Sequence, residues 1–415
     1  MIAKMILLCG VFGETLFFTI LTVFGMSYLG ITESSIYVYY WAGVCFFVAL
    51  LTVKLVLSAN YTKKASVLFG YIMISIIFLC IYGIGAVLFH LDPIIIRYGR
   101  AFLAMACPSF IIGVICSDDM HREYLGTIMV KFIPIATLLL LYNMMRQLDV
   151  GYMESLGGMN RLGTGYYAAQ LLAVTLCLLH MKREKRQMVK VGYLHSSFQR
   201  LILLLLLFVQ ILVVLFSASR GPVIAMTFLL LYFLVLLSGD NSWKKLTKVV
   251  SFGVIMFLIY RTLAVPSLPH FTNSVGRIAT ILRISSGDDI STGRIFMYRK
   301  GIDMFLRKPL FGNGPQAFAI KSGYDIYPHN IFVELLCDYG IVGTILWMLL
   351  FLYVFAKYVK NKETDWVVSL VFSIALVVAV ELMFSGTFTY NAQFWFVVGF
   401  GMFLPKRRNE YRVPE

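Results

Sequence analysis

The sequence predicts an all-α membrane protein of about twelve transmembrane helices, forming one membrane domain over residues 1–415. Hydrophobic residues make up 60% of the chain and charged residues only 14%, whereas soluble domains contain about 25% charged residues. Apolar stretches of about 20 residues, which cross a bilayer as helices, recur along the whole chain. These stretches lack the apolar and polar alternation of a barrel strand, so helices are the expected elements.

The expected spans follow from the length of each apolar stretch. No removable signal peptide precedes the first stretch, which we therefore interpret as a retained membrane helix. Helices are expected across residues 5–29, 36–57, 66–89, 94–116, 124–144, 162–180, 201–217, 222–238, 246–264, 341–359, 366–384 and 392–405.

Basic residues fall in every second connection between these spans, as the positive-inside rule requires of cytoplasmic loops. The N- and C-termini join this cytoplasmic set. The same distribution accounts for the net charge of +15 without nucleic acid as a partner. The cytoplasmic basic residues are Lys63, Lys64, Arg122, Lys182, Arg183, Lys185, Arg186, Lys190, Lys244, Lys245, Lys248, Lys357, Lys360, Lys362, Lys406, Arg407 and Arg408.

The other connections face outward, and the extracytoplasmic loop 265–340 is long enough to have structure of its own. Within it, Ser291-Thr292-Gly293-Arg294 is typical of a helix start, and Pro309 marks the end of that helix. Function is therefore expected to depend on this loop. The helix should be amphipathic and lie on the membrane surface, because apolar residues recur at helical spacing at Ile295, Tyr298, Ile302 and Phe305.

The outward-facing connections are rich in arginine, whose planar guanidinium group suits phosphate oxygens. The alternative is that such arginines reach lipid headgroups. Arg220 favours an anion site, because it lies in a short turn between two spans and Pro222 starts the second helix beside it. The free N–H groups and the positive dipole end of that helix then point to the same place as the guanidinium group.

Arg97 and Arg100 lie three residues apart on one helical face, near the outer end of the fourth span. A pair of this kind needs an anion, an acidic partner or water. Ligand contact and structural pairing both stay open. Lys131 in the fifth span has the same status, with Glu14 or Glu381 as conceivable partners.

His329 is the outer histidine that belongs to a pattern, Tyr327-Pro328-His329-Asn330 followed by Glu334. Pro328 would fix the start of a helix whose first turn presents His329 and Asn330 at the outer surface. An imidazole titrates near neutral pH and can accept a proton from a sugar hydroxyl. The sequence thus offers a candidate base on the outer side.

Asp288-Asp289 is the alternative centre, since paired acids can hold a divalent cation. An acidic pair just before a helix start also favours the helix dipole, and no third ligand is spaced to help. The seven cysteines form no CxxC pair, so neither a zinc site nor a disulfide framework is expected. No metal site and no cofactor are therefore predicted.

Three segments follow one another in a characteristic order. They are Ser217-Ala218-Ser219-Arg220-Gly221; Thr292-Gly293-Arg294 with Met304 and Lys308-Pro309-Leu310-Phe311-Gly312-Asn313-Gly314; and Pro328-His329-Asn330 through Glu334 to Gly340-Ile341-Val342-Gly343. Together they resemble the O-antigen ligase and polymerase superfamily of bacterial envelope glycan assembly. The resemblance covers roughly residues 200–355, and Gly157 to Arg161 resembles a further arginine site of the family.

The resemblance implies a glycosyltransferase of the bacterial inner membrane that works on the outer face. Its donor would be an oligosaccharide on polyprenyl diphosphate, with Arg220 and Arg294 holding the diphosphate and His329 acting as the base, without metal. An acceptor hydroxyl would displace the diphosphate at the anomeric carbon, with inversion. Further substrate contacts are expected from Arg161, Arg97, Arg100, Asn330 and Glu334.

The short stretch between Pro309 and His329, with its compact Gly312 to Pro315 turn, favours a polymerase whose acceptor is another lipid-linked repeat unit. A ligase would instead transfer the glycan to a lipid core oligosaccharide or a protein. A flippase for lipid-linked glycans would share the spans but would not need the outer histidine motif. The expected partners are polyprenyl-diphosphate-linked oligosaccharides and membrane lipids, with a chain-length regulator protein as a further candidate.

Overall fold

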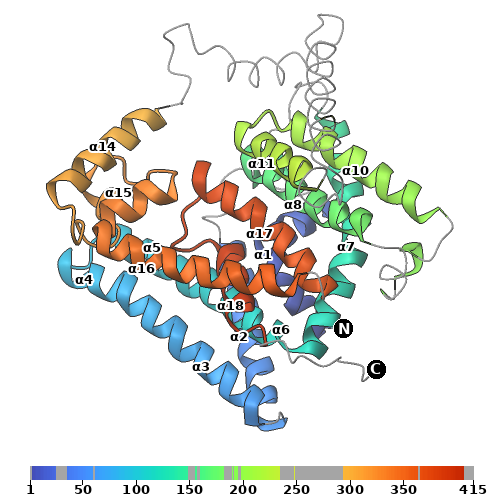
Figure 1. The fold of residues 1–415 in the computed structure, drawn as a ribbon, viewed down its shortest axis with the longest axis horizontal. Coiled ribbons are helices and arrows are strands. Elements are labelled where there is room, and N and C mark those ends of the chain that lie inside the picture. The colour runs from blue at the N-terminus through green and yellow to red at the C-terminus, as the bar shows by residue number, and fades with distance from the viewer. Residues whose placement is uncertain are drawn as a thin grey trace, which may run out of the picture.

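The computed structural model describes residues 2–24, 35–58, 61–147, 155–156, 159–181, 189, 191–194, 198–233, 247, 293–362 and 365–405. These residues form a helical bundle with one two-stranded hairpin, β1 (Ser155–Leu156) and β2 (Met159–Asn160) (Figure 1). Within these ranges, nine helices are long and apolar enough to cross a membrane. The predicted all-α membrane class is therefore confirmed.

Helices occupy eleven of the twelve expected spans. The remaining span, 246–264, lies outside the described residues except for residue 247, as do Asp288-Asp289, so the total of twelve stays a prediction. The helices are α1 (Ile2–Val23), α2 (Ser35–Ser58), α3 (Tyr61–Phe78), α4 (Ile84–Leu88), α5 (Pro93–Ala101), α6 (Cys107–Cys116), α7 (Asp119–Arg146), α8 (Arg161–His180), α10 (Gln199–Phe216), α11 (Arg220–Leu231), α14 (Arg294–Arg307), α15 (Ala317–Lys321), α16 (Ile331–Asn361), α17 (Trp366–Phe384) and α18 (Ala392–Met402).

Two expected spans contain a π-helical turn near their middle. The turn Leu79–Gly83 joins α3 to α4, and the turn Phe102–Ala106 joins α5 to α6. Each span is nevertheless one continuous helical run, 63–88 and 93–116, as the apolar pattern predicts. Pro108, in the first turn of α6, lacks the backbone N–H that a continuous α-helix would use, which helps explain the second turn.

α16 begins at Ile331, where the sequence predicts a helix start after Pro328, and its bend lies next to the predicted start of the apolar span at 341. Its first turns carry the buried acids Glu334 and Asp338, so the purely apolar stretch begins only after the bend. Gly340 bends the helix with φ 63° and ψ −167°. The extracytoplasmic position of the predicted loop 265–340 stays a prediction.

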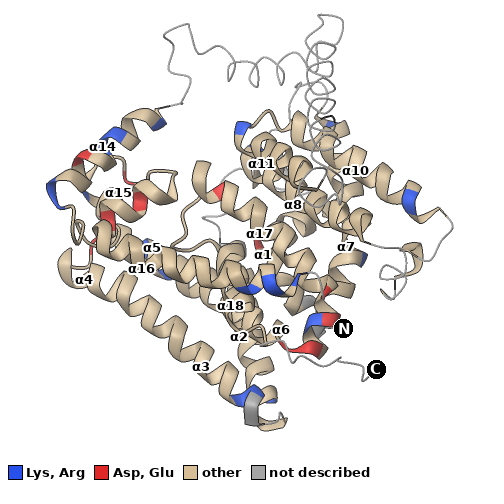
Figure 2. Cartoon of the chain, in the orientation of Figure 1, with Lys and Arg blue, Asp and Glu red and all other residues tan. Residues whose placement is uncertain are grey.

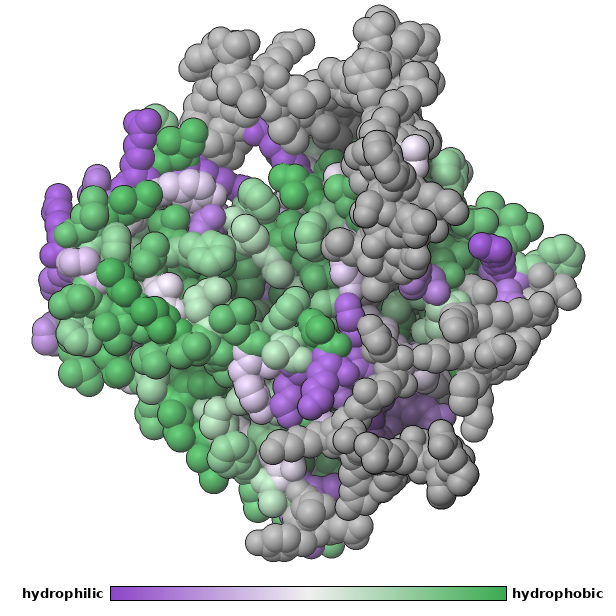
Figure 3. Space-filling view, in the orientation of Figure 1, coloured by the Kyte–Doolittle hydropathy of each residue, from purple (hydrophilic) through white to green (hydrophobic). Residues whose placement is uncertain are grey.

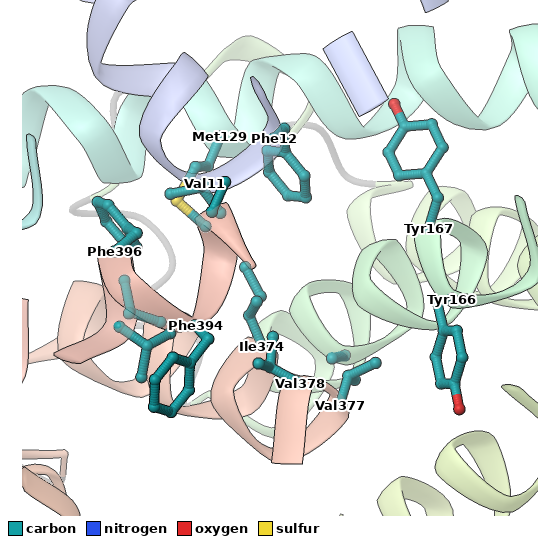
Figure 4. Close-up of a cluster of buried hydrophobic side chains, with 14 of the residues drawn as sticks. Val11, Phe12, Met129, Tyr166, Tyr167, Ile374, Val377, Val378, Phe394 and Phe396 are labelled. Carbon is teal, nitrogen blue, oxygen red and sulfur yellow. The ribbon is translucent and has the colours of Figure 1, made fainter. Parts of the chain in front are cut away.

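Close contact between α6 and α18 forms the centre of the bundle. An added Cβ on Gly113 would stand 2.7 Å from the backbone nitrogen of Phe400, and one on Gly399 would stand 3.1 Å from the carbonyl carbon of Phe110. Small residues let membrane helices approach in this way. α1 packs against both helices of this pair, α17 packs against α18, and α8 packs against α17. Figure 4 shows buried side chains of α1, α17 and α18 close together.

The outermost helices present apolar side chains to the surroundings. Phe46 and Leu57 of α2 and Leu346 of α16 are 60%, 78% and 63% exposed. Figure 3 shows a broad hydrophobic surface over α3 and α16. An exposed apolar surface of this extent fits contact with lipid chains.

Ion pairs join three of the connections that the sequence predicts to be cytoplasmic. Lys63 binds Asp118 at 2.8 Å, and Arg122 binds Asp365 at 2.7 Å, so the starts of α3, α7 and α17 lie together at one end. Figure 2 shows that charged residues gather mainly near helix ends. The grouping agrees with the predicted alternation, whereas the identity of that end as cytoplasmic stays a prediction.

Candidate functional site

Three arginines are each the first residue of a helix: Arg161 of α8, Arg220 of α11 and Arg294 of α14. A cation at the positive end of a helix dipole costs about 0.3–1 kcal/mol, and acidic residues are favoured there instead. The first turns of these three helices contain no acidic residue. Guanidinium groups and free backbone N–H groups at one end of several helices form a site suited to an anion.

Glycine contacts bring the starts of α8 and α11 together. An added Cβ on Gly165 would stand 2.6 Å from Ser217 Oγ and 2.7 Å from Pro222 Cγ. The first turn of α8 therefore lies against the turn that carries Arg220. Arg161 and Arg220 begin neighbouring helices, as the predicted arginine site requires.

Arg294, Asn330 and His329 all contact the C-terminal end of α17. The last carbonyls of a helix and the negative end of its dipole favour cations and hydrogen-bond donors. The guanidinium group of Arg294 donates a hydrogen bond to the carbonyl of Phe384. Asn330 Nδ2 donates to the carbonyl of Met383 at 3.1 Å. The start of α14 and the start of α16 are thus fixed to the same helix end.

His329 binds the next carbonyl in this series. Its Nδ1 donates to the carbonyl oxygen of Ser385 at 2.8 Å, and the ring centroid of Tyr327 lies 4.6 Å away. A carbonyl can only accept, so the neutral imidazole carries its proton on Nδ1. Nε2 is then the nitrogen that can accept a proton.

The surroundings of His329 keep the imidazole neutral. Burial is the main cause that lowers the pKa of His329 below its ordinary value, and the positive charge of Arg294 lowers it further. The hydrogen bond to the Ser385 carbonyl acts in the opposite direction and raises the pKa. A neutral imidazole beside a guanidinium group is competent as a general base at neutral pH.

Asn330 caps α16 as well as anchoring it. Its Oδ1 accepts hydrogen bonds from the backbone N–H groups of Phe332 at 3.0 Å and Val333 at 3.1 Å. An N-cap of this type stabilises a helix by about 1 kcal/mol. The amide therefore positions the turn that carries His329, and its contact with substrate stays a prediction.

Glu334 lies in the first turn of α16 and is 1% exposed. Its Oε1 accepts a hydrogen bond from Thr387 Oγ1 at 2.6 Å, while Oε2 has no hydrogen-bond partner among the described residues. The carboxyl group therefore joins α16 to the connection between α17 and α18. A substrate contact at Glu334 stays a prediction.

Arg97 of α5 approaches the segment that leads to His329. It donates a hydrogen bond to the carbonyl of Asp325 at 2.9 Å and lies 5.0 Å from the ring centroid of Tyr98. Of the two open alternatives, these contacts support the structural one for Arg97, while Arg100 is exposed on the same helix. Substrate contacts for both arginines stay predictions.

Lys131 is exposed and takes part in none of the four ion pairs found among the described residues. The conceivable pairing with Glu14 or Glu381 is therefore not observed. The two glutamates instead lie close enough to each other to interact electrostatically, on α1 and α17.

The glycine-rich turn after α14 fits into the bend of α16. The carboxylate of Asp338 accepts hydrogen bonds from the backbone N–H groups of Gln316 and Phe318, at 3.0 and 2.9 Å. Asn313 N donates to the Cys337 carbonyl at 3.0 Å. This interlocking holds α14, and with it Arg294, at a fixed position beside the helix that His329 precedes.

Sequence reasoning missed two residues at the centre of this arrangement, Tyr166 and Ser385. The hydroxyl of Tyr166 lies 3.2 Å from Ser385 Oγ, and both side chains are buried. Each residue is part of, or next to, an apolar span and belongs to no motif. The one available signal was that Tyr166 follows Arg161 on the same helix by five residues, about one and a half turns.

Comparison with known proteins addresses the family to which the chain is similar. A family described as O-antigen ligase matches residues 201–348, which include Arg220, Arg294 and His329. This match confirms the resemblance to the O-antigen ligase and polymerase superfamily. No curated protein matches the chain. Tyr166 and Ser385 lie outside the matched residues.

Proposed function

We propose that this chain polymerises oligosaccharide repeat units carried on polyprenyl diphosphate, at the outer face of the bacterial inner membrane. The O-antigen ligase match supports glycosyl transfer of the ligase and polymerase type. The observation that carries the finer proposal is the arrangement of arginine-initiated helices and His329 around the C-terminal end of α17.

The arginines would bind the donor. A diphosphate develops negative charge as it leaves, and Arg220 and Arg294 provide planar guanidinium groups that can bind two phosphate oxygens at once. The N–H groups at the starts of α11 and α14 would add further donors. Arg161, at the start of α8, is a third candidate for the same anion.

His329 would act on the acceptor. As Nε2 takes the hydroxyl proton, the acceptor oxygen forms a bond to the anomeric carbon, and the bond between that carbon and the phosphate oxygen breaks. Polyprenyl diphosphate leaves with the electron pair, and the configuration at the anomeric carbon inverts. The imidazolium ion formed is stabilised by the Ser385 carbonyl until its proton is released to water.

The acceptor decides between polymerase and ligase. Between α14 and α16 the structure has only the glycine-rich turn, the five-residue helix α15 and the short segment 322–330 that leads to α16. Two similar repeat-unit substrates need little additional protein there, whereas a bulky lipid core would require a larger docking surface. This compactness supports the polymerase, and transfer to a lipid core is the competing outcome.

The direct test uses purified protein in detergent with a single lipid-linked repeat unit. A polymerase should convert the unit into a ladder of longer products, and His329→Ala should lower the rate by at least about a hundredfold. A product that forms only when a lipid core oligosaccharide is added would identify a ligase. If the lipid-linked unit is left unchanged under both conditions, transport becomes the better explanation.

A further inference from the structure

We propose that Tyr166 is a positioning residue, which fixes Ser385 so that the Ser385 carbonyl holds His329 in the orientation of a base. Its catalytic consequence rests on the function proposed above. The positioning itself can be measured without substrate.

Ser385 ends α17 in a constrained geometry. Its backbone N–H donates to the carbonyl of Glu381 at 2.7 Å, and its own carbonyl accepts from His329 Nδ1 at 2.8 Å. The side chain is held separately, because Ser385 Oγ lies 3.2 Å from the hydroxyl of Tyr166. The hydroxyl of Tyr327 also donates to the Ser385 carbonyl, at 3.3 Å. The direction of the carbonyl that orients His329 therefore depends on this contact and on the attachments of Ser385 to α17 and α8.

The same hydroxyl lies under the start of α11. A Cβ added to Gly221 would overlap the hydroxyl oxygen of Tyr166 and would stand 3.3 Å from Ser385 Oγ. Gly221 directly follows Arg220, so a larger residue there would displace both contacts. Tyr166 is thus in contact with the helix start that carries Arg220 and with the residue that orients His329.

Arg294 completes the surroundings of this hydroxyl. It lies close enough to interact electrostatically with Tyr166 and with His329. Tyr166 therefore lies among the elements that carry both proposed diphosphate ligands and the base. A buried hydroxyl in this position can keep the anion site and the base at a constant separation.

Tyr167 provides a matched control, since it is the next residue of α8 and is equally buried. Figure 4 shows the two rings pointing in opposite directions. The hydroxyl of Tyr167 lies 3.2 Å from Thr19 Oγ1 of α1, a different partner from that of Tyr166. Removing either hydroxyl deletes one buried polar contact, but only Tyr166 should affect His329.

The first experiment is nitrogen NMR of histidine-labelled protein in detergent, with the His329 signal assigned by its loss in His329→Gln. Wild type should show the proton on Nδ1. In Tyr166→Phe we expect a mixture of tautomers and a lower His329 pKa, because the carbonyl bond that raises it is weakened. Tyr167→Phe should match wild type. Identical His329 spectra in Tyr166→Phe and wild type would overturn the proposal.

The second experiment is a double-mutant cycle on transfer activity. Tyr166→Phe and Ser385→Ala should each lower kcat about tenfold, roughly the effect of one buried hydrogen bond. The double variant should be no worse than either single one, because both remove the same contact. Fully additive losses, or an equal loss in Tyr167→Phe, would contradict a shared positioning role. Expected NMR changes in a protein without transfer activity would instead refute the function alone.

Discussion

At the scale of single residues, several residues of the candidate site have backbone conformations or helix positions that their residue types disfavour. His329 has a φ of 59°, in the left-handed region, where a residue other than glycine loses about 1–3 kcal/mol. The carbonyl of Ser385 and the ring of Tyr327 hold it there. Three arginines at the positive ends of helix dipoles are a second departure from preference, and such departures concentrate at functional sites.

The electrostatic setting of His329 predicts the pH dependence of transfer. A general base works only when it is unprotonated, and the pKa of His329 is lowered by burial and by Arg294. The kcat/KM for the donor, which reports ionisations of the free enzyme, should therefore stay constant from neutral pH downward and fall only below the ordinary imidazole value of about 6.5. Arg294→Gln removes a charge that lowers the pKa, so the acid limb should move to higher pH. A limb that moves to lower pH, or stays in place, would contradict this assignment.

The geometry of guanidinium groups predicts the effect of conservative substitutions. Arg220→Lys and Arg294→Lys keep the charge but lose the planar fork that binds two phosphate oxygens. Each should lower transfer by roughly one to two orders of magnitude, a loss on the order of 1–3 kcal/mol. Arg299→Lys, exposed on the same helix as Arg294, is the control. Full activity of both variants would move diphosphate recognition to Arg97 and Arg100.

At the scale of helices and turns, the sequence predicts elements better than the contacts between them. Apolar length gives the helical spans, and Gly293 with Pro309 correctly brackets α14. The sequence cannot reveal that Arg294, Asn330 and His329 donate hydrogen bonds to carbonyls at the end of α17. Every residue has a backbone carbonyl, so these acceptors leave no residue-specific signal. For the same reason the glycine-rich turn was recognisable as a turn, but its place in the bend of α16 was not.

The bend of α16 at Gly340 leads us to predict the effect of a side chain at this position. An added Cβ would stand 2.5 Å from the nitrogen of Gly312 and the carbonyl of Leu310, and the φ of 63° already disfavours a side chain. Gly340→Ala should therefore lower the unfolding temperature measurably, or prevent accumulation of folded protein. Gly323→Asn is the control, since Gly323 also has a positive φ but has no neighbour within 4 Å of its added Cβ. Equal unfolding temperatures for Gly340→Ala and wild type would show that the bend is dispensable.

At the scale of the whole molecule, the described helices place charge at two separated ends. One end carries the ion pairs of Lys63 and Arg122. The other end carries the arginine-initiated helices and His329. A lipid-linked substrate would have its diphosphate at the second end and its chain among the apolar side chains exposed on the outer helices. This division fits transfer at one membrane face.

The choice of acceptor is a prediction about the whole molecule, and cells can test it. If the chain is a polymerase, deleting its gene should leave a single repeat unit on the surface acceptor, because ligation continues while elongation stops. The readout is the size distribution of surface glycans, with restoration by the wild-type gene and not by His329→Ala. A ligase would behave in the opposite way, since long chains would accumulate on the polyprenyl carrier and none would be transferred. The short connection between α14 and α16 leads us to expect the single repeat unit.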